Sequence, residues 1–409
     1  MSLSSNLISA CAAAWLCLAV PLPAAAQAAL PEAPSPSDAD LRALQQSLGA
    51  DTQAAAPTAA AAPSDLGSVM NPKISLIFDG AAAWFKGPPG GTGGHDPTHS
   101  GFNLQALELH MDSDVDPYLH LDANIVFHVD GVEIEEIYAT SLALPANLQL
   151  RAGQFLAPIG RLNQTHPHSW QFLDQPLVLG KFLGSDGSRG LGTELSWLTP
   201  LPWFAELRAV AMEAGAGSCC SRSYLGDHTA GIDARDVLYT LAFKQFFDVT
   251  PDWSLLWGLS AQTGPNGAAP DARTAIYATD LYVKYRPVAD SQRAAVALQA
   301  EWLLRERWLM GSRLQDHGAY AQIVWDVDPR WELGVRSEYA TGLRDDALDP
   351  AWVSVRTRQA VQLTWYPSHF SRLRLQGGYD RRPWMPADAG WSVMLGLETL
   401  IGAHGAHAY

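Results

Sequence analysis

DVDPYLHLDANIVFHVDG, residues 114–131, places one strand between two tight turns. Asp116-Pro117 begins the first turn and Asp130-Gly131 forms the second, because these residue pairs favour reversals of the chain. Between the turns apolar and polar side chains alternate, which is the period of a β-strand with two different faces. The apolar face carries Leu119, Leu121, Ala123, Ile125, Phe127 and Val129, and the polar face carries Tyr118, His120, Asp122, Asn124 and His128.

Short turns that contain proline recur along the chain, and most of them have aromatic neighbours. Each joins two runs of alternating residues, as in a meander of antiparallel strands. The aromatic residues beside the turns indicate that this end of the strands lies at a membrane interface. The turns are DVDPYLHL (114–121), LALPANLQL (142–150), WLTPLPWFAEL (197–207), DVTPDWSLL (248–256), KYRPVADSQ (284–292), DVDPRWEL (326–333) and WYPSHFSRL (365–373).

The period of two begins at Asn71 and predicts an all-β fold, a transmembrane antiparallel up-and-down β-barrel of about 16 strands. An even number of strands places both chain ends on the side of the proline turns. The longer, Gly-rich connections, such as 86–101 and 214–231, then lie on the outer side. The expected strands are 71–85, 102–113, 118–129, 132–143, 147–156, 190–198, 203–213, 234–247, 253–262, 274–286, 293–308, 315–326, 331–340, 352–365, 372–381 and 391–402.

The alternation alone fits a soluble β-structure or a membrane barrel. In a soluble sandwich the apolar face points inward, whereas in a membrane barrel the polar face lines the lumen and the apolar face meets lipid. The 15 Trp residues and the wide spacing of the turns favour the membrane barrel. The net charge of −15 argues against a nucleic-acid partner, because a phosphate-binding surface needs a basic excess. The expected partner is outer-membrane lipid, and the expected location is the bacterial outer membrane.

Residues 1–28 have the features of a secretory signal peptide, an apolar stretch too short to span a bilayer followed by small residues. Residues 29–69 are rich in Ala, Pro and Ser and predict a periplasmic linker with one short helix. The region is either a periplasmic spacer, or its helix self-associates or docks on the periplasmic mouth of the barrel. The barrel is expected to occupy 70–409. After the signal only Cys219 and Cys220 remain, which excludes a disulfide scaffold.

LPANLQLRAGQFLAPIGRLNQ, residues 144–164, resembles the phosphate-selective porin type of outer-membrane channel. In that family a strand with a basic residue and a Gly-Gln-Phe step runs into a Pro-Ile/Phe-Gly turn that opens the long third loop. The resemblance implies a channel of about 16 strands with an infolded third loop, assembled as a homotrimer. The family conducts several solutes and this chain has few lysines, so the resemblance does not assign phosphate. The matching positions are Arg151, Gly153, Gln154, Phe155, Pro158 and Gly160.

The longest expected connection is the third outer loop, residues 157–190. A loop of this length in a compact fold is usually functional. It either folds into the lumen and sets the constriction of the channel, or it covers the outer surface of a trimer. Trp170 and Phe172 are expected to pack it against the inner wall. Its charged residues are Arg161, Asp174, Lys181, Asp186 and Arg189.

The inward faces predict two sectors of opposite charge. Together they either set up a field across the channel, which orients polar solutes and filters ions, or the arginines pair with acidic neighbours such as Glu332 and Glu338 and only rigidify the wall. The expected basic pore-lining residues are Arg336, Arg356, Arg358, Arg372, Arg374 and Arg382. The expected acidic and histidine pore-lining residues are Glu108, His110, Asp112, His120, Asp122 and His128.

Three of these histidines also suggest a metal site. His110, His120 and His128 lie on adjacent expected strands together with Asp112 and Asp122. Further histidines lie on outer loops, at His95, His99, His166 and His168. Neutral imidazole and carboxylate suit Zn²⁺ or a similar ion. The spacing is not that of a known metal motif, so polar side chains that merely fill the lumen explain the pattern as well.

The function that the sequence favours is a porin-like outer-membrane channel for passive diffusion of small polar or charged solutes. An enzyme is not expected, because the chain has neither a GxSxG motif nor an arrangement typical of a Ser/His/acid triad. Zinc-type metal uptake or binding is one alternative, and a barrel enzyme or adhesin is another. No resident cofactor is expected.

Overall fold

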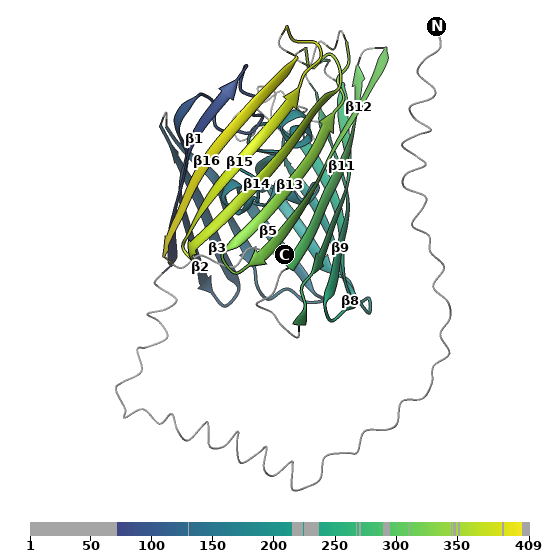
Figure 1. Ribbon diagram of the computed structural model, residues 1–409. Coiled ribbons are helices and arrows are strands. Elements are labelled where there is room, and N and C mark those ends of the chain that lie inside the picture. Colours follow the sequence, from purple (N-terminus) through teal and green to yellow (C-terminus); the bar gives the residue numbers. More distant parts are fainter. Residues whose placement is uncertain are drawn as a thin grey trace, which may run out of the picture. The chain divides into compact units, whose positions relative to one another are not determined.

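The described part of the chain forms one closed antiparallel barrel of sixteen strands in the computed structural model (Figure 1). Each strand pairs with its neighbours in sequence, and β1 closes the ring by pairing with β16. The expected all-β transmembrane barrel is confirmed. The structure describes residues 72–129, 131–214, 224, 237–266, 268–269, 271–288, 295–309, 311–344, 346, 349–350, 352–386 and 388–402. The expected signal peptide and linker helix, and Cys219 and Cys220, lie outside these residues.

The strand bounds agree closely with the pattern of alternation. The expected strand 331–340 is found without change, and the largest difference is in β14, which begins at Arg356 rather than at residue 352. The strands are β1 Lys73–Lys86, β2 Gly101–Asp116, β3 Leu119–His128, β4 Gly131–Ser141, β5 Leu148–Leu156, β6 Arg189–Leu198, β7 Phe204–Glu213, β8 Val237–Thr250, β9 Trp253–Pro265, β10 Arg273–Tyr285, β11 Ala295–Leu309, β12 Ser312–Asp328, β13 Trp331–Ala340, β14 Arg356–Ser368, β15 Ser371–Arg381 and β16 Ala389–Gly402.

The proline turns form the short connections at one end of the barrel. In two of them an aspartate holds the turn closed: Asp116 Oδ1 accepts the N–H groups of Tyr118 and Leu119, and Asp328 Oδ1 accepts those of Arg330 and Trp331. This side-chain bond mimics a backbone turn. The turns therefore depend on local chemistry, and for that reason the sequence predicts them well.

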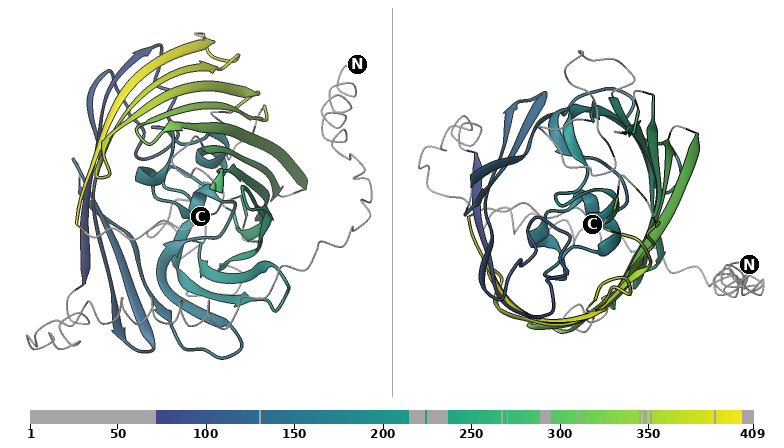
Figure 2. Two further views of the ribbon diagram at one scale, coloured as in Figure 1. Left: turned by 60° about the horizontal axis from the view of Figure 1, so that its bottom comes forward. Right: turned by 90° about the horizontal axis from the view of Figure 1, so that it is seen from above.

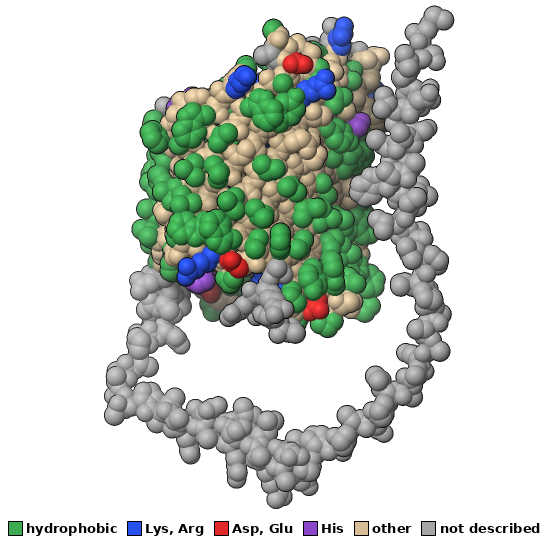
Figure 3. Space-filling model, viewed as in Figure 1, with side chains coloured by type: hydrophobic (Ala, Val, Ile, Leu, Met, Phe, Trp, Pro, Cys, Tyr) green, Lys and Arg blue, Asp and Glu red, His purple; other side chains and the backbone are tan. Residues whose placement is uncertain are grey.

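The outer face of the barrel is apolar. Along β13 Trp331, Leu333 and Val335 point outward and are exposed, whereas Glu332, Arg336 and Glu338 are buried inside. Figure 3 shows the apolar side chains over the wall and charged ones gathered toward its two ends. Aromatic pairs lie beside the short turns, with ring centroids 4.9 Å apart for Trp253 and Tyr285. Such a surface is stable in lipid, because the closed barrel satisfies its own backbone groups.

No helix in the described ranges is both long and apolar enough to cross a bilayer. The helical segments of the described chain are short and belong to the loop between β5 and β6. They are η1 Leu162–Gln164, η2 Pro167–Ser169 and α4 Leu177–Phe182.

The loop between β5 and β6, residues 157–188, lies inside the ring of strands (Figure 2). We call this segment the third loop. Its apolar side chains, among them Ile159, Val178 and Phe182, are fully buried together with Leu303 and Ile276 of the wall. The main apolar core of this barrel is therefore the contact between the third loop and the inner wall. The segment thus takes the infolded arrangement and not that of a cover on the outer surface.

Candidate functional site

The third loop turns into the lumen at a glycine. Gly160 has φ +64, and a Cβ at this position would overlap Glu301 Oε2. Glu301 in turn accepts the backbone N–H groups of Arg161, at 3.1 Å, and Leu162, at 2.8 Å. A residue with a side chain would therefore meet both backbone strain and a clash. The Pro158 to Gly160 turn that supports the resemblance thus directs the loop toward β11.

Arginines of β13 and β14 hold the middle of the third loop. Arg336 donates to the backbone oxygen of Asp174, at 2.9 Å, and to its carboxylate, at 2.5 Å. Arg358 lies 2.9 Å from the other Asp174 oxygen and donates to the backbone oxygen of Gln175, at 2.5 Å. Both guanidinium groups also contact Glu338. Burial alone would raise the pKa of Asp174, but Arg336 and Arg358 outweigh it and lower the pKa to about 2.

Arginines of β15 hold the preceding part of the loop in the same way. Arg372 donates to the backbone oxygen of His168, and Arg374 donates to that of Trp170, at 3.1 Å. Glu398 of β16 accepts from both arginines, at 2.7 and 3.1 Å. We call Arg336, Arg358, Arg372 and Arg374, with these carboxylates, the arginine sector.

Arg356 and Arg382 contact the first loop, residues 87–100, rather than the third. Arg356 donates to the backbone oxygen of Gly90 and pairs with Asp380 at 2.5 Å, and Arg382 donates to Pro88 at 2.8 Å. The first loop also reaches the third loop, since Asp96 accepts the N–H of Gln175 at 2.8 Å. Burial and the neighbouring Asp174 raise the pKa of Asp96 to about 6.

Five of the six predicted arginines lie on the inward faces of β13, β14 and β15, and Arg382 directly follows β15. All six are buried and contact a loop. Their carboxylate partners include Glu338, one of the two that the sequence suggested. The other, Glu332, accepts hydrogen bonds from Thr364 and Tyr366. The remaining partners, Asp174, Asp380, Asp79 and Glu398, were not foreseen.

On another part of the inner wall, a β-bulge in β4 turns two adjacent glutamates inward. Asn124 of β3 pairs with Glu136, but Ile125 pairs with Ile134, so Glu135 is the extra residue. Glu135 and Glu136 are consequently both buried, at 3% and 8% exposure. A bulge re-aims side chains in this way. The amide of Gln154 in β5 donates to the backbone oxygen of Ile134, at 2.5 Å, and so supports the bulge.

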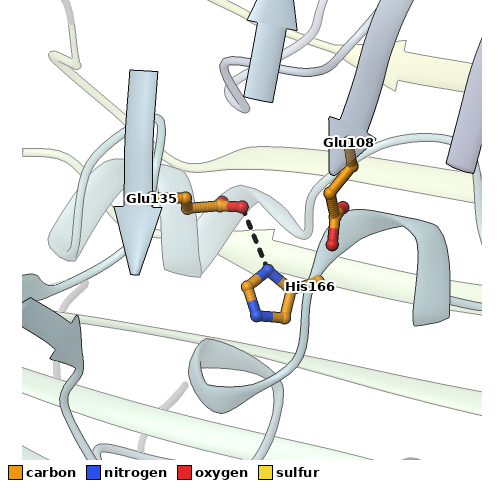
Figure 4. Close-up of side chains that lie close together, drawn as sticks. All are labelled: Glu108, Glu135 and His166. Atoms are coloured by element: carbon orange, nitrogen blue, oxygen red, sulfur yellow. Dashed lines mark hydrogen bonds and ion pairs between the residues drawn. The ribbon is translucent and has the colours of Figure 1, made fainter. Parts of the chain in front are cut away.

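Two histidines of the third loop meet these carboxylates. His166 Nδ1 lies 3.0 Å from Glu135 Oε2 (Figure 4). The other ring nitrogen, His166 Nε2, lies 2.9 Å from Glu136 Oε2. His168 Nδ1 lies 2.7 Å from Glu108 Oε2, and the two imidazole rings stack with centroids 5.8 Å apart. We call Glu108, Glu135, Glu136, His166 and His168 the histidine–carboxylate sector. Although burial opposes it, the charges of Glu135 and Glu108 hold the pKa of His166 well above its usual range.

The predicted metal set of His110, His120 and His128 is not brought together. His120 and His128 are eight residues apart on β3, which corresponds to about 26 Å along a strand. His110 and His120 lie beside Asp112, at 3.6 and 3.8 Å. His128 instead lies 3.6 Å from Glu133. This prediction was wrong because alternation places residues on one face without limiting their separation along the strand.

The six acidic and histidine residues predicted to line the pore lie on the inward faces of β2 and β3. Glu108 and Asp112 are buried, and His110, His120, Asp122 and His128 are partly buried. Glu108 lies beneath the third loop in the histidine–carboxylate sector. His120 is 2.6 Å from Asp114 and 3.6 Å from Asp122.

The charged residues predicted for the constriction occupy different environments. Arg161 lies 4.2 Å above the ring of Tyr282 and is partly buried. Lys181 is buried and 2.5 Å from Asp316, and burial lowers the pKa of Lys181 to about 8. Arg189 begins β6 and pairs with Glu133. Asp186 is partly buried and accepts from the Ser185 hydroxyl at 2.7 Å. Asp174 belongs to the arginine sector.

Sequence reasoning missed the convergence of Glu135, Glu136 and His166. One signal was available: the outward residues Ile134 and Ile137 are three positions apart, whereas an uninterrupted strand would place them two or four apart. The doubled glutamate between them marks the bulge.

Comparison with known proteins assigns the chain to a family. It is 31% identical over 363 residues to an uncharacterised protein of Aquifex aeolicus (strain VF5), across 78% of this chain and 73% of that protein. The chain belongs to the family of this Aquifex protein. No established protein-family profile matches the chain.

Three solved structures that are similar to this member of the family are outer-membrane barrels. Pseudomonas putida OprB matches with a TM-score of 0.56 and 10% identity, over 82% of this chain and 95% of OprB. An anion-selective porin from Comamonas acidovorans gives a TM-score of 0.53 and 12% identity, over 81% and 99%. The trimer form of Vibrio cholerae OmpT gives 0.53 and 9%, over 81% and 99%. At these identities the likeness shows the fold, that of a bacterial outer-membrane barrel.

Proposed function

We propose that the protein is a porin-like channel that passes small polar or charged solutes across the outer membrane by diffusion. One observation carries the proposal: a long loop lies inside a closed barrel whose outer surface is apolar. A lumen narrowed by a fixed internal segment restricts solutes by size and by the polar groups at its edge. Arg161, Gln164 and Lys244 are only partly buried, and Lys244 donates to Gln164 at 2.7 Å.

Within this proposal the third loop forms the constriction, and its polar rim sets which solutes pass. Membership of the phosphate-selective porin type is supported only by the motif at residues 144–164. Its inward basic residue, Arg151, pairs with Glu194 at 3.0 Å and contacts the ring of Phe155. A homotrimer is also part of the proposal, and the trimer form of OmpT is the supporting analogy. The buried ion pairs of the six arginines favour the alternative in which they rigidify the wall over a field across the channel. We infer no catalytic role, since no triad motif is present in the sequence.

Swelling of proteoliposomes tests this function. Vesicles containing the refolded protein are diluted into isotonic solutions of uncharged sugars and zwitterionic amino acids of increasing size. A diffusion channel gives swelling rates that fall steadily with solute size. Vesicles containing heat-unfolded protein give the background rate. Swelling at this background rate for the smallest solutes would contradict the proposal.

A further inference from the structure

One group of side chains in the described barrel combines a histidine and two carboxylates at close range. The ligand atoms of Glu108 in β2, Glu135 in β4 and His166 in the third loop all lie within 4.8 Å of one another. Glu108 and Glu135 are buried and His166 is partly buried. We propose that these three residues bind a divalent transition-metal cation, with Zn²⁺ as the best match, and that this cation links the third loop to the inner wall.

The distances are close to those that a zinc ion requires. Zinc bonds of about 2.0–2.2 Å to nitrogen and oxygen place neighbouring ligand atoms roughly 3.3 Å apart in a tetrahedral site. His166 Nδ1 and Glu135 Oε2 are 3.0 Å apart, so these two ligands are already in place. The ligand atom of Glu108 lies within 4.8 Å of the other two, so the Glu108 carboxylate must move closer to complete the site.

The side chains that hydrogen-bond to His166 and Glu108 are also of the kind that surrounds a metal site. A histidine that binds a metal through one ring nitrogen usually donates its other N–H to a carboxylate, which fixes the tautomer. His166 Nε2 is 2.9 Å from Glu136 Oε2, so Nδ1 is the nitrogen left to face the cation. The Glu108 carboxylate is oriented in turn by His168, whose Nδ1 lies 2.7 Å from Oε2.

A buried amide beside the three ligands offers a further oxygen. Asn124 is 2% exposed, and its Oδ1 has no hydrogen-bond partner among the described residues. Its Nδ2 lies 2.9 Å from His166 Nδ1 and 3.1 Å from Glu135 Oε2. The two ends of an amide are assigned from the hydrogen-bond network, and a half-turn of this amide puts the oxygen among the ligand atoms. The cation then has one nitrogen and three oxygen ligands.

The composition of the site selects among cations. One imidazole with carboxylate and amide oxygens suits Zn²⁺ and similar ions. Calcium requires six to eight oxygen ligands, and magnesium retains several waters in an octahedron, so both need more oxygen ligands than this set supplies. Cation binding at this site does not depend on the proposed channel function. It can be measured without any flux of solute through the barrel.

Calorimetric titration of Zn²⁺ into the folded full-length protein in detergent micelles tests the site. We expect one saturable Zn²⁺ site per chain, with Ca²⁺ and Mg²⁺ failing to compete. Glu108→Gln or His166→Gln should weaken binding at this site at least about 100-fold. Glu136→Gln, which removes only the outer partner of His166, should weaken it about 10- to 100-fold.

Two control variants separate this site from other histidines. His110→Gln/His120→Gln removes the partly buried imidazoles beside Asp112, and His404→Gln/His407→Gln removes those of the C-terminal sequence. Both variants should keep the site. Loss of binding in either control, or unchanged binding in Glu108→Gln or in His166→Gln, would overturn the proposal.

The visible spectrum of bound Co²⁺ gives a second measurement that a purely structural role of these residues would not affect. Intense d–d absorption in the folded wild type indicates four-coordinate binding, and it should disappear in Glu108→Gln. Folding of each variant is checked by its heat-dependent mobility in a gel. Weak absorption in the wild type, typical of hydrated six-coordinate Co²⁺, would contradict the proposed ligand set.

Discussion

The arginine sector and the histidine–carboxylate sector hold the same loop in different ways. In the arginine sector the wall supplies guanidinium groups, and the loop mainly supplies backbone oxygens such as those of Trp170 and Gln175. In the histidine–carboxylate sector the wall supplies carboxylates, and the loop supplies the side chains of His166 and His168. Arginine keeps its charge at every physiological pH, whereas imidazole does not. One attachment is therefore permanent, and the other depends on side chains that can also bind protons or metals.

The two sectors also differ in how strongly they restrict the residue types of the third loop. A bond to a backbone oxygen survives most substitutions in the loop, so the arginine sector constrains where the loop lies more than which residues it contains. The imidazole contacts require histidine at two positions. We therefore expect the arginine sector to determine the position of the third loop, and the histidine–carboxylate sector to adjust it.

The largest expected effect follows from breaking the arginine sector at Arg336. Arg336→Ala leaves Asp174 and Glu338 buried with one cation fewer, and such a change costs about 3–5 kcal/mol. The free energy of unfolding in urea, measured in micelles, checks this value. Arg286→Ala is the matched control, because its pair with Asp326 is exposed on both sides and should contribute about 0–1 kcal/mol. Equal losses in the two variants would show that the buried contacts of Arg336 do not hold the loop.

The next effect concerns Asp96, a carboxyl beside the arginine sector whose pKa is raised to about 6. Its pKa of about 6 in the folded protein lies above 3.8, the ordinary pKa of an aspartate side chain. The folded state therefore binds the proton more tightly, and the resulting stability is present below about pH 4 and is lost as pH rises through about 6. The groups that face Asp96 are Asp174, Arg358 and the backbone of Gly93 and Gln175.

We expect the free energy of unfolding to fall by up to about 3 kcal/mol between pH 4 and pH 7 on account of this carboxyl. Unfolding curves at several pH values measure the slope. Asp96→Asn should remove the part of the slope that Asp96 contributes. An unchanged slope in this variant would assign the pH dependence to other groups.

A smaller effect tests how the loop enters the lumen. Gly160→Ala meets both positive φ and the Glu301 carboxylate, whereas Gly311→Ala meets positive φ with no atom nearby. Backbone strain of this kind costs about 1–3 kcal/mol in each variant. Gly160→Ala should therefore lose more unfolding free energy than Gly311→Ala, and the excess measures the contact with Glu301. Equal losses of unfolding free energy in the two variants would mean that Glu301 moves aside for the added methyl group at no cost.

The smallest effect concerns the bulge that builds the histidine–carboxylate sector. Gln154→Ala removes the amide that donates to the Ile134 backbone oxygen and should cost about 1 kcal/mol, the usual contribution of one hydrogen bond. Gln149→Ala, an exposed residue of the same strand, should change the unfolding free energy by less than about 0.5 kcal/mol. A loss in Gln154→Ala no larger than this control would mean that the bulge does not need the Gln154 amide.

The strands and short turns could be predicted because their causes are local. A period of two in 331–340 and an Asp-Pro pair at 328–329 act over a few residues. The partners of the inward arginines could not be predicted, because they depend on the path of the third loop. Arg336 and Asp174 are 162 positions apart, and Arg372 and His168 are 204 apart. Alternation indicates that an arginine faces inward, but it does not indicate which carboxylate meets it.

The candidate site was predicted in part for the same reason. The alternation placed Glu108 on the inward face, but the bulge at Glu135 interrupts the period and brings Glu136 inward as well. The sequence indicated His166 only as one of several loop histidines that could bind a metal, without the partners that it contacts. The position of a loop residue inside the barrel follows from packing against the wall, which no local pattern contains.

The central claim is that the third loop lies inside the lumen and narrows it. Single-channel conductance in KCl tests this claim most directly, with the wild type compared to a variant in which residues 163–186 are replaced by a short Gly-Ser linker. Circular dichroism and heat-dependent gel mobility establish that the variant barrel is folded. We predict discrete openings in the wild type and a several-fold larger conductance in the variant. Equal conductance in two folded barrels would contradict the account.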